Sequence, residues 1–226
     1  MTMPHGTFPP LTPHPPEPPR PRHDPWHPEP RPPAPGAASA SAALVVGGGD
    51  WLAERLLDQR VVTLSGELDT DAVNRAVAEL ALLDATGDDP VRLRLSGVGA
   101  DLEGALTLVD ALDLVGVPVH ATSLGTLSGP AVAVLAVADR RVAGAHAMVR
   151  LCEPRAPRGV PGREVEAWAA EHARQLRRLQ ERLAAACGRS VDEVAADMRA
   201  GRLLDAEEAR AYGLVDHQAP SRAGEG

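Results

Sequence analysis

The sequence predicts an α/β fold in which a mainly parallel sheet is flanked by helices. Two observations indicate this class. Short β-branched or alternating apolar runs take turns with segments whose apolar residues are spaced three and four apart, and the connections between them are short. The chain has 226 residues, of which 44% are apolar, so it can form one sizeable domain plus a tail.

The alternation begins near residue 50. Apolar pairs at 51–52 and 56–57 predict a short amphipathic helix, and the β-branched run 61–64 predicts a strand that ends at Gly66. Apolar residues at 73, 77, 80 and 83 then predict a helix that Thr70 or Asp71 caps. The strict alternation of residues 91–95 predicts a half-buried strand, and a helix over 101–114 follows.

The second half of the chain continues the pattern. Residues 117–121 predict a strand, and Gly129-Pro130 opens an apolar helix through Ala138, because proline is favourable in a first helical turn. A long helix is expected over residues 164–187, and Gly188 caps its C-terminal end. The remaining predicted segments are strands at Val142 and 147–151 and short helices over 191–199 and 206–211.

The N-terminal region differs sharply in composition from the rest. Residues 1–36 hold 15 of the 22 prolines, which predicts a disordered or polyproline-II-like tail. Residues 37–49 form a small-residue linker, residues 50–217 the folded domain, and residues 218–226 a flexible C-terminal end. The tail also contains four histidines without fixed spacing, so we expect no metal site there.

Charge and cysteine content exclude several classes of protein. The net charge is −8, and the arginines, which are all 23 of the basic residues, form no dense cluster along the sequence, so nucleic-acid binding is not expected. Cys152 and Cys187 are too few for a disulfide framework and lack metal-ligand spacing. No apolar run is long enough to span a membrane, and no signal-peptide pattern is present. We therefore expect a cytoplasmic protein without a membrane partner.

Four motifs, in order, resemble the Clp protease proteolytic subunit family, ClpP. They are RLLDQRVVTLSGELD (55–69), LSGVGADL (95–102), EHARQLRRLQERL (171–183) and DAEEARAYGLVD (205–216). The resemblance implies a ClpP/crotonase-like ββα spiral core with a protruding handle helix. It also implies seven-membered rings stacked in pairs, an AAA+ Clp unfoldase as partner, unfolded polypeptide as substrate, and no cofactor.

The family's chemistry requires a serine, a histidine, an aspartate and an oxyanion hole. The family's serine lies four residues after a glycine, and strict spacing from Gly125 puts Gly129 at that position. A one-residue shift puts Ser128 there instead. Alternatively, Ser128 is only the N-cap of the following helix. The interpretations exclude each other, because one residue turns a helical side chain by roughly 100°.

The other positions of the site also depart from the family pattern. Cys152 occupies the place of the family's histidine, where a thiol is no substitute for an imidazole; alternatively it is a small buried strand residue. Asp197 aligns with the family's aspartate or is a solvated helix residue. Gly99, Ala100 and Gly129 match the oxyanion hole, and Ala100 would be strained if that position needs a positive φ.

The four motifs that resemble the family are present, whereas the residues at the positions of the catalytic site differ from the family pattern. We therefore predict a ClpP-family ring subunit of an ATP-dependent Clp protease with lost or much reduced serine peptidase activity, a structural or regulatory pseudo-enzyme that assembles with itself or with a ClpP paralogue. The first alternative is an active serine endopeptidase, a hydrolase that uses Ser128. The second is a crotonase-like acyl-CoA enzyme, in which paired backbone amides bind a thioester oxygen.

Overall fold

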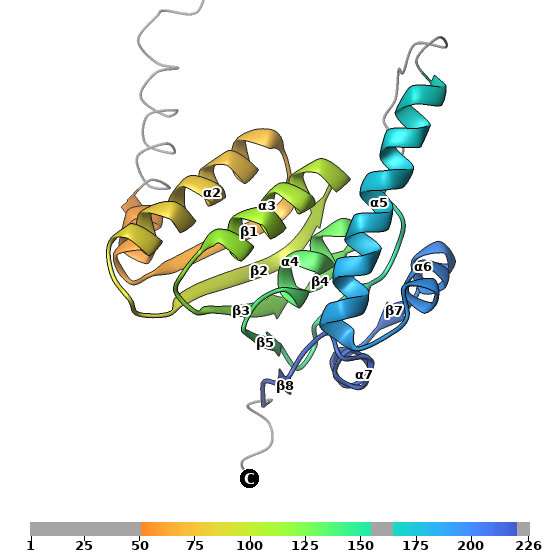
Figure 1. Cartoon of the computed structure of the whole chain (residues 1–226). Helices are drawn as coiled ribbons and strands as arrows, with labels where there is room; N and C mark the ends of the chain where they lie inside the picture. Colours follow the sequence, from red (N-terminus) through yellow and green to blue (C-terminus); the bar gives the residue numbers. More distant parts are fainter. Residues whose placement is uncertain (1–50, 155–164, 221–226) are drawn as a thin grey trace, which may run out of the picture. The chain divides into compact units, whose positions relative to one another are not determined.

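A computed structural model describes residues 51–154 and 165–220 (Figure 1). The predicted tail (1–36) and linker (37–49) lie outside these residues, as does the segment 221–226 of the predicted C-terminal end. Residues 218–219 are part of the fold, because Gln218 belongs to a strand and the Ala219 N–H donates to the carbonyl of Ala143 at 2.8 Å. The folded segment therefore extends slightly past the predicted boundary at residue 217.

The described residues form one eight-stranded sheet. Its order is β7-β6-β4-β2-β3-β5-β8, with β1 paired to β2 beside this path. Every pairing is parallel except β6 with β7, which confirms the predicted α/β class with a parallel-rich sheet. The strands are β1 (Val61–Leu68), β2 (Val91–Ala100), β3 (Val119–Leu124), β4 (Thr126–Ser128), β5 (Arg140–Ala143), β6 (Met148–Arg150), β7 (Leu203–Leu204) and β8 (His217–Gln218).

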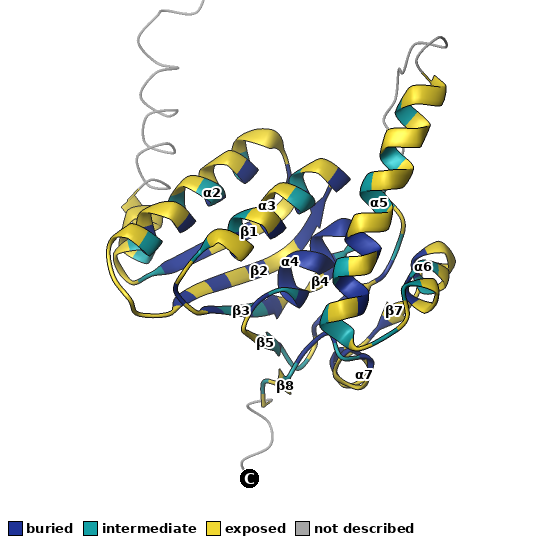
Figure 2. Ribbon diagram, viewed as in Figure 1, coloured by how far each residue is buried: buried dark blue, intermediate teal, exposed yellow. Residues whose placement is uncertain are grey.

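Helices cover the sheet and bury its apolar side. Residues 51–58 form a first short helix, and α2 and α3 lie side by side above the sheet (Figure 1). The side chains that face inward are buried, whereas the outward faces of α2 and α3 are exposed (Figure 2). The labelled helices are α2 (Thr70–Ala85), α3 (Leu102–Leu114), the 3₁₀ helix η1 (Gly129–Ala131), α4 (Val132–Ala136), α5 (Val165–Cys187), α6 (Val191–Ala200) and α7 (Ala206–Tyr212).

The partners of β2 change near its C-terminal end, and this change positions the site. On one side, β3 pairs with β2 up to Ser96, and β4 takes over at Gly99, which pairs with Ser128. Gly97 and Gly125 both have positive φ values, +61° and +68°, so their backbones can turn where β3 gives way to β4. A pocket forms where the strands diverge.

The helix α5 stands out as the predicted protruding handle. Its buried residues, Leu179, Gln180, Leu183 and Ala184, all lie in its C-terminal half. The N-terminal half extends away from the sheet (Figure 1). The family's handle helix therefore has its counterpart here. Across the described segments, the structure contains no helix with the length and apolar character that a membrane span requires.

Candidate active site

A pocket of about 340 Å³ lies at the C-terminal ends of β2 and β4 and beside the segment that follows β6. Most of the predicted site residues meet here. Its lining residues are Glu67, Gly99, Ala100, Asp101, Thr126, Ser128, Gly129, Pro130, Arg150, Cys152, Glu153 and Pro154. The structure thus brings together five of the six predicted positions, which lie up to 53 residues apart along the chain (from 99 to 152).

Gly129 occupies a sharp turn between a strand and a helix. It follows β4 directly, begins η1 and has a φ of +61°. Serine hydrolases such as the α/β hydrolases expose their nucleophile on a strained strand-to-helix turn of this kind. A Cβ placed on Gly129 would lie 3.6 Å from Sγ of Cys152. This geometry favours the interpretation that pairs Gly129 with Cys152 at the places of nucleophile and base.

Ser128 lies one residue earlier, in an extended conformation with φ −134° and ψ 146°. In the sheet it is the partner of Gly99 on one side and of Arg150 on the other. It holds the N-cap position of η1, as the capping interpretation predicts, but its side chain makes no capping hydrogen bond. The hydroxyl is half-buried and lines the pocket, so it remains a second candidate for reactive chemistry.

The residues of the predicted oxyanion hole have ordinary strand conformations. Gly99 and Ala100 end β2, and neither is among the residues with positive φ. The strain that a positive φ would cause at Ala100 is therefore absent. A Cβ at Gly99 would meet the carboxylate of Glu67, which is the flexible end of a side chain. Glu67 is a pocket residue that motif matching alone did not single out, because its proximity depends on the pairing of β1 with β2.

Asp197 does not line this pocket. Its carboxylate accepts a hydrogen bond of 2.9 Å from the Tyr212 hydroxyl and pairs with Arg202 at 3.2 Å. Burial and the Asp197 carboxylate together raise the pKa of Tyr212. The Asp197 helix still touches the site, because the Glu153 N–H donates to the carbonyl of Met198 at 3.1 Å. The Asp197 carboxylate therefore has Arg202 and Tyr212 as its partners.

Among the residues that the structure describes, no histidine lines this pocket. The histidines of the described segments are His120, His146, His172 and His217, and none of them lines it. Within the same segments, no three histidine, cysteine or carboxylate side chains come together as a metal site would require. The described lining therefore supplies a serine hydroxyl, a thiol, backbone amides and the carboxylates of Glu67, Asp101 and Glu153, but not the imidazole that a serine peptidase uses as its base.

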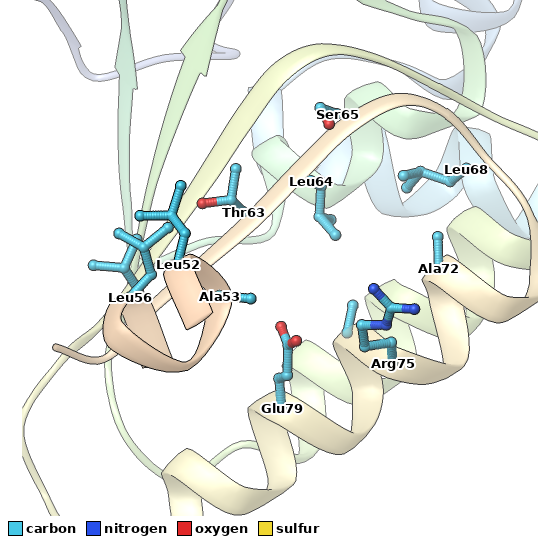
Figure 3. Close-up of a pocket in the computed structure, with 12 residues that line it drawn as sticks. Leu52, Ala53, Leu56, Thr63, Leu64, Ser65, Leu68, Ala72, Arg75 and Glu79 are labelled. Atoms are coloured by element: carbon cyan, nitrogen blue, oxygen red, sulfur yellow. The ribbon is translucent and has the colours of Figure 1, made fainter. Parts of the chain in front are cut away.

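A second pocket, of about 310 Å³, lies between the helix 51–58, β1 and α2 (Figure 3). Its floor is apolar, with Leu56, Leu64 and Leu68 among the lining residues, and Arg75 and Glu79 project from α2 beside it. Burial raises the pKa of Glu79, and the Arg75 charge opposes this rise. The pocket contains none of the predicted site residues, so it is separate from the candidate active site.

Comparison with known proteins gives concordant matches. The family described as Clp protease matches residues 40–221, which include every described residue. The ATP-dependent Clp protease proteolytic subunit 3 of Rhodococcus jostii (strain RHA1) is 33% identical over 179 residues, covering 77% of this chain and 88% of the relative. A proteolytic subunit 2 of Nocardia farcinica (strain IFM 10152) is 29% identical, covering 79% and 89% respectively. A proteolytic subunit-like protein of Streptomyces coelicolor is 34% identical, covering 74% and 82%.

Proposed function

The chain belongs to the Clp protease family, and we propose that it is a ring-forming subunit whose own peptidase activity is lost or much reduced. One observation carries the proposal. At the turn where a nucleophile is expected, Gly129 has no side chain. The thiol of Cys152 faces this position, and its sulfur would lie 3.6 Å from a Cβ placed on residue 129. A hydroxyl and an imidazole are both missing from the pair that serine peptidase chemistry needs.

The third member of the triad also lacks a task in this arrangement. Asp197 is hydrogen-bonded to Tyr212 and Arg202, which fixes its carboxylate away from the pocket lining. Its contacts are those of a structural residue that ties α6 to α7. Without a hydroxyl and an imidazole at the paired positions, a carboxylate here has no catalytic task, which is consistent with this structural use.

The remaining role of such a subunit is structural. The sheet, the helical layer and the protruding α5 are present, and the family resemblance implies that the protruding arm interlocks rings. We propose that this chain assembles with itself or with an active paralogue into a seven-membered ring, and that the ring works with a Clp unfoldase on unfolded polypeptide. The relatives are named as proteolytic subunits of ATP-dependent proteases, which supports this assignment.

One observation favours a second candidate function, that of an active serine endopeptidase. Ser128 lines the same pocket as Gly99 and Cys152, and its hydroxyl is not used as a helix cap. In that case Ser128 would react with an unusual base.

Labelling with a fluorophosphonate probe distinguishes the two. The purified chain is labelled alone and after co-expression with a catalytically intact paralogue, followed by peptide mapping, with Ser128→Ala as the control. Native mass spectrometry of the same samples measures assembly. We expect no adduct on this chain and an oligomer of defined subunit number.

An adduct on Ser128 that disappears in the control would show a working nucleophile and would overturn the loss of activity. A chain that stays monomeric both alone and with the paralogue would overturn the ring-subunit role. The two parts of the proposal can therefore fail independently.

A further inference from the structure

One row of residues across the sheet runs through the candidate active-site pocket and carries opposite charges at its two ends. The row consists of direct partners on four neighbouring strands: Glu67 on β1, Gly99 on β2, Ser128 on β4 and Arg150 on β6. All four line the same pocket of about 340 Å³. They lie up to 83 positions apart in the sequence (from 67 to 150), so only the strand pairing brings them together.

The charges at the two ends are not used elsewhere in the described part of the chain. Glu67 and Arg150 are exposed, and neither takes part in an ion pair there. The other two carboxylates of the pocket are engaged, because Glu153 pairs with Arg199 at 3.8 Å and Asp101 caps α3. The row therefore has one free anionic end and one free cationic end.

The distance between these ends determines the length of a ligand that can reach both. The carboxylate of Glu67 lies over Gly99, and its carboxyl carbon would lie 3.0 Å from a Cβ placed on that glycine. The negative charge is thus carried inward from β1 to β2, which is two strands away from Arg150. Because neighbouring strands lie about 4.8 Å apart, the two charges are separated by about 10 Å.

The middle of the row leaves room for a ligand between the charges. Gly99 has no side chain, and the side chain of Ser128 is small and half-buried. The Ser128 hydroxyl makes no capping hydrogen bond, so it can bond to a polar group of a ligand above it.

We propose that this pocket binds a short free peptide of about three residues by both of its ends, with the terminal ammonium at Glu67 and the terminal carboxylate at Arg150. An extended peptide advances about 3.3–3.6 Å per residue, so three residues span about 10 Å. A guanidinium group can hold a carboxylate through two parallel hydrogen bonds. The inference rests on the proposed function, because only a pocket without peptidase activity leaves a bound peptide intact.

This ligand class differs from the unfolded polypeptide proposed above as the substrate of the ring. An internal stretch of a long chain offers neither a terminal ammonium nor a terminal carboxylate to the row. A free amino acid has both charges, but they are too close together to reach Glu67 and Arg150 at once. The row therefore selects short peptides, the chemical class that proteolysis releases.

Ligand-observed NMR titration of the full chain with alanine peptides of one to six residues tests the proposal. We expect the affinity to be highest for trialanine. Acetylating its amino end or amidating its carboxyl end should each weaken binding by about threefold, since exposed ion pairs contribute modestly. These comparisons use only the unaltered chain, so they do not depend on the folding of any variant.

Two variants assign the ends of the peptide to the ends of the row. Glu67→Gln is expected to bind free and acetylated trialanine equally and to keep its preference for a free carboxylate, and Arg150→Gln should show the reverse. The matched controls are Glu207→Gln and Arg210→Gln, which remove exposed charges of the same signs from α7, outside the pocket lining. Both controls are expected to bind like the unaltered chain.

An affinity that does not depend on peptide length would overturn the proposal, as would the absence of saturable binding of trialanine. A loss on acetylation that persists in Glu67→Gln would overturn the assignment of that end. Mass spectrometry of the peptide after the titration separates this inference from the proposed function. Trialanine that binds at both ends but is cleaved would overturn the loss of activity and leave the two-ended site in place, whereas an intact peptide without end preference would overturn only the site.

Discussion

Gly129 combines a left-handed φ of +61° with open space in the direction of Cys152. A side chain there costs about 1–2 kcal/mol for its conformation, but with the nearest atom 3.6 Å from the Cβ position it meets no clash. We therefore expect Gly129→Ser to fold with a small loss of stability. The double variant Gly129→Ser/Cys152→His restores a hydroxyl and an imidazole at the paired positions, and it should react with a fluorophosphonate at least about 100-fold faster than the single variant.

The rate of labelling, followed by mass spectrometry, measures this gain, with Ser128→Ala added to the double variant so that only residue 129 can react. Circular dichroism checks that each variant is folded. A folded double variant that reacts no faster than Gly129→Ser would contradict the assignment of Gly129 and Cys152 to these positions. An adduct on Ser128 in the unaltered chain would contradict it as well.

A half-buried thiol and a buried phenol give the fold a dependence on alkaline pH. Burial raises the pKa of the Cys187 thiol from 9.0 to about 11, and burial and Asp197 raise the pKa of Tyr212 above its usual 10. Each folded group keeps its proton at a pH where the unfolded chain loses it. Stability is thus complete below pH 9 and falls as pH rises toward the folded values, by at most about 1.4 kcal/mol per pH unit for each group.

Urea unfolding under reducing conditions at a series of pH values tests this assignment. Cys187→Ala is expected to flatten the fall that begins near pH 9, and Tyr212→Phe the part that begins near pH 10. If the slopes of both variants match that of the unaltered chain, other groups are responsible. Tyr212→Phe also removes the hydrogen bond to Asp197, which should cost about 1 kcal/mol at neutral pH.

At the scale of whole elements, the contact between the end of α5 and the end of α7 depends on a single glycine. Gly213 caps α7 with a φ of +94°, and a Cβ there would lie 2.6 Å from the carbonyl oxygen of Cys187 and 3.1 Å from its Cα. Gly213→Ala must separate two backbones as well as accept strain, so we expect it to lower the free energy of unfolding by more than about 2 kcal/mol.

Gly201 provides a matched control. It caps α6 with a φ of +70°, and nothing lies within 4 Å of its Cβ position. Gly201→Ala therefore measures the backbone strain alone, about 1 kcal/mol. Denaturant unfolding compares the two variants, and equal losses would show that the close approach of Gly213 to Cys187 carries no energy.

The elements also show where sequence patterns suffice. The helices α2 and α5 follow their apolar spacing closely, with observed bounds of Thr70–Ala85 and Val165–Cys187. The strands β4, β7 and β8 have three, two and two residues, too few to show an alternation. The strand β1 continues beyond Gly66 to Leu68, because a shift of register between Ser65 and Gly66 absorbs the glycine.

The candidate site was predictable only as far as local motifs extend. Family spacing identified five of the residues that line the pocket, but it left Ser128 and Gly129 undecided, because the difference depends on φ at one turn. The engagement of Asp197 by Tyr212 and Arg202 depends on how α6 and α7 pack, which no local pattern records. The single helix predicted over 129–138 is observed as η1 followed by the short α4. The turn at Gly129 determines how this segment begins, and the apolar pattern does not show that turn.

For the whole molecule, the protruding half of α5 connects the fold to the proposed assembly. A stripe of residues at helical spacing runs along it, from Trp168 and His172 through Leu176 to the buried Leu179 and Leu183. The lower part of the stripe packs in the protomer core. The upper part carries Trp168 stacked on His172, with ring centroids 4.8 Å apart, and both side chains are half-exposed. A partly exposed tryptophan of this kind is a typical anchor of a subunit interface.

We therefore expect Trp168→Ala to weaken assembly while leaving the protomer folded, because Trp168 lies outside the hydrophobic core. Sedimentation velocity and native mass spectrometry should show a shift from paired rings to single rings or smaller species, with at least about a tenfold change in the dissociation constant. Trp51→Ala is the matched control, since Trp51 is 62% exposed on the first helix, away from α5. If the two variants have the same mass distribution as the unaltered chain, α5 does not join rings; if only Trp51→Ala dissociates them, the interface lies at the first helix instead.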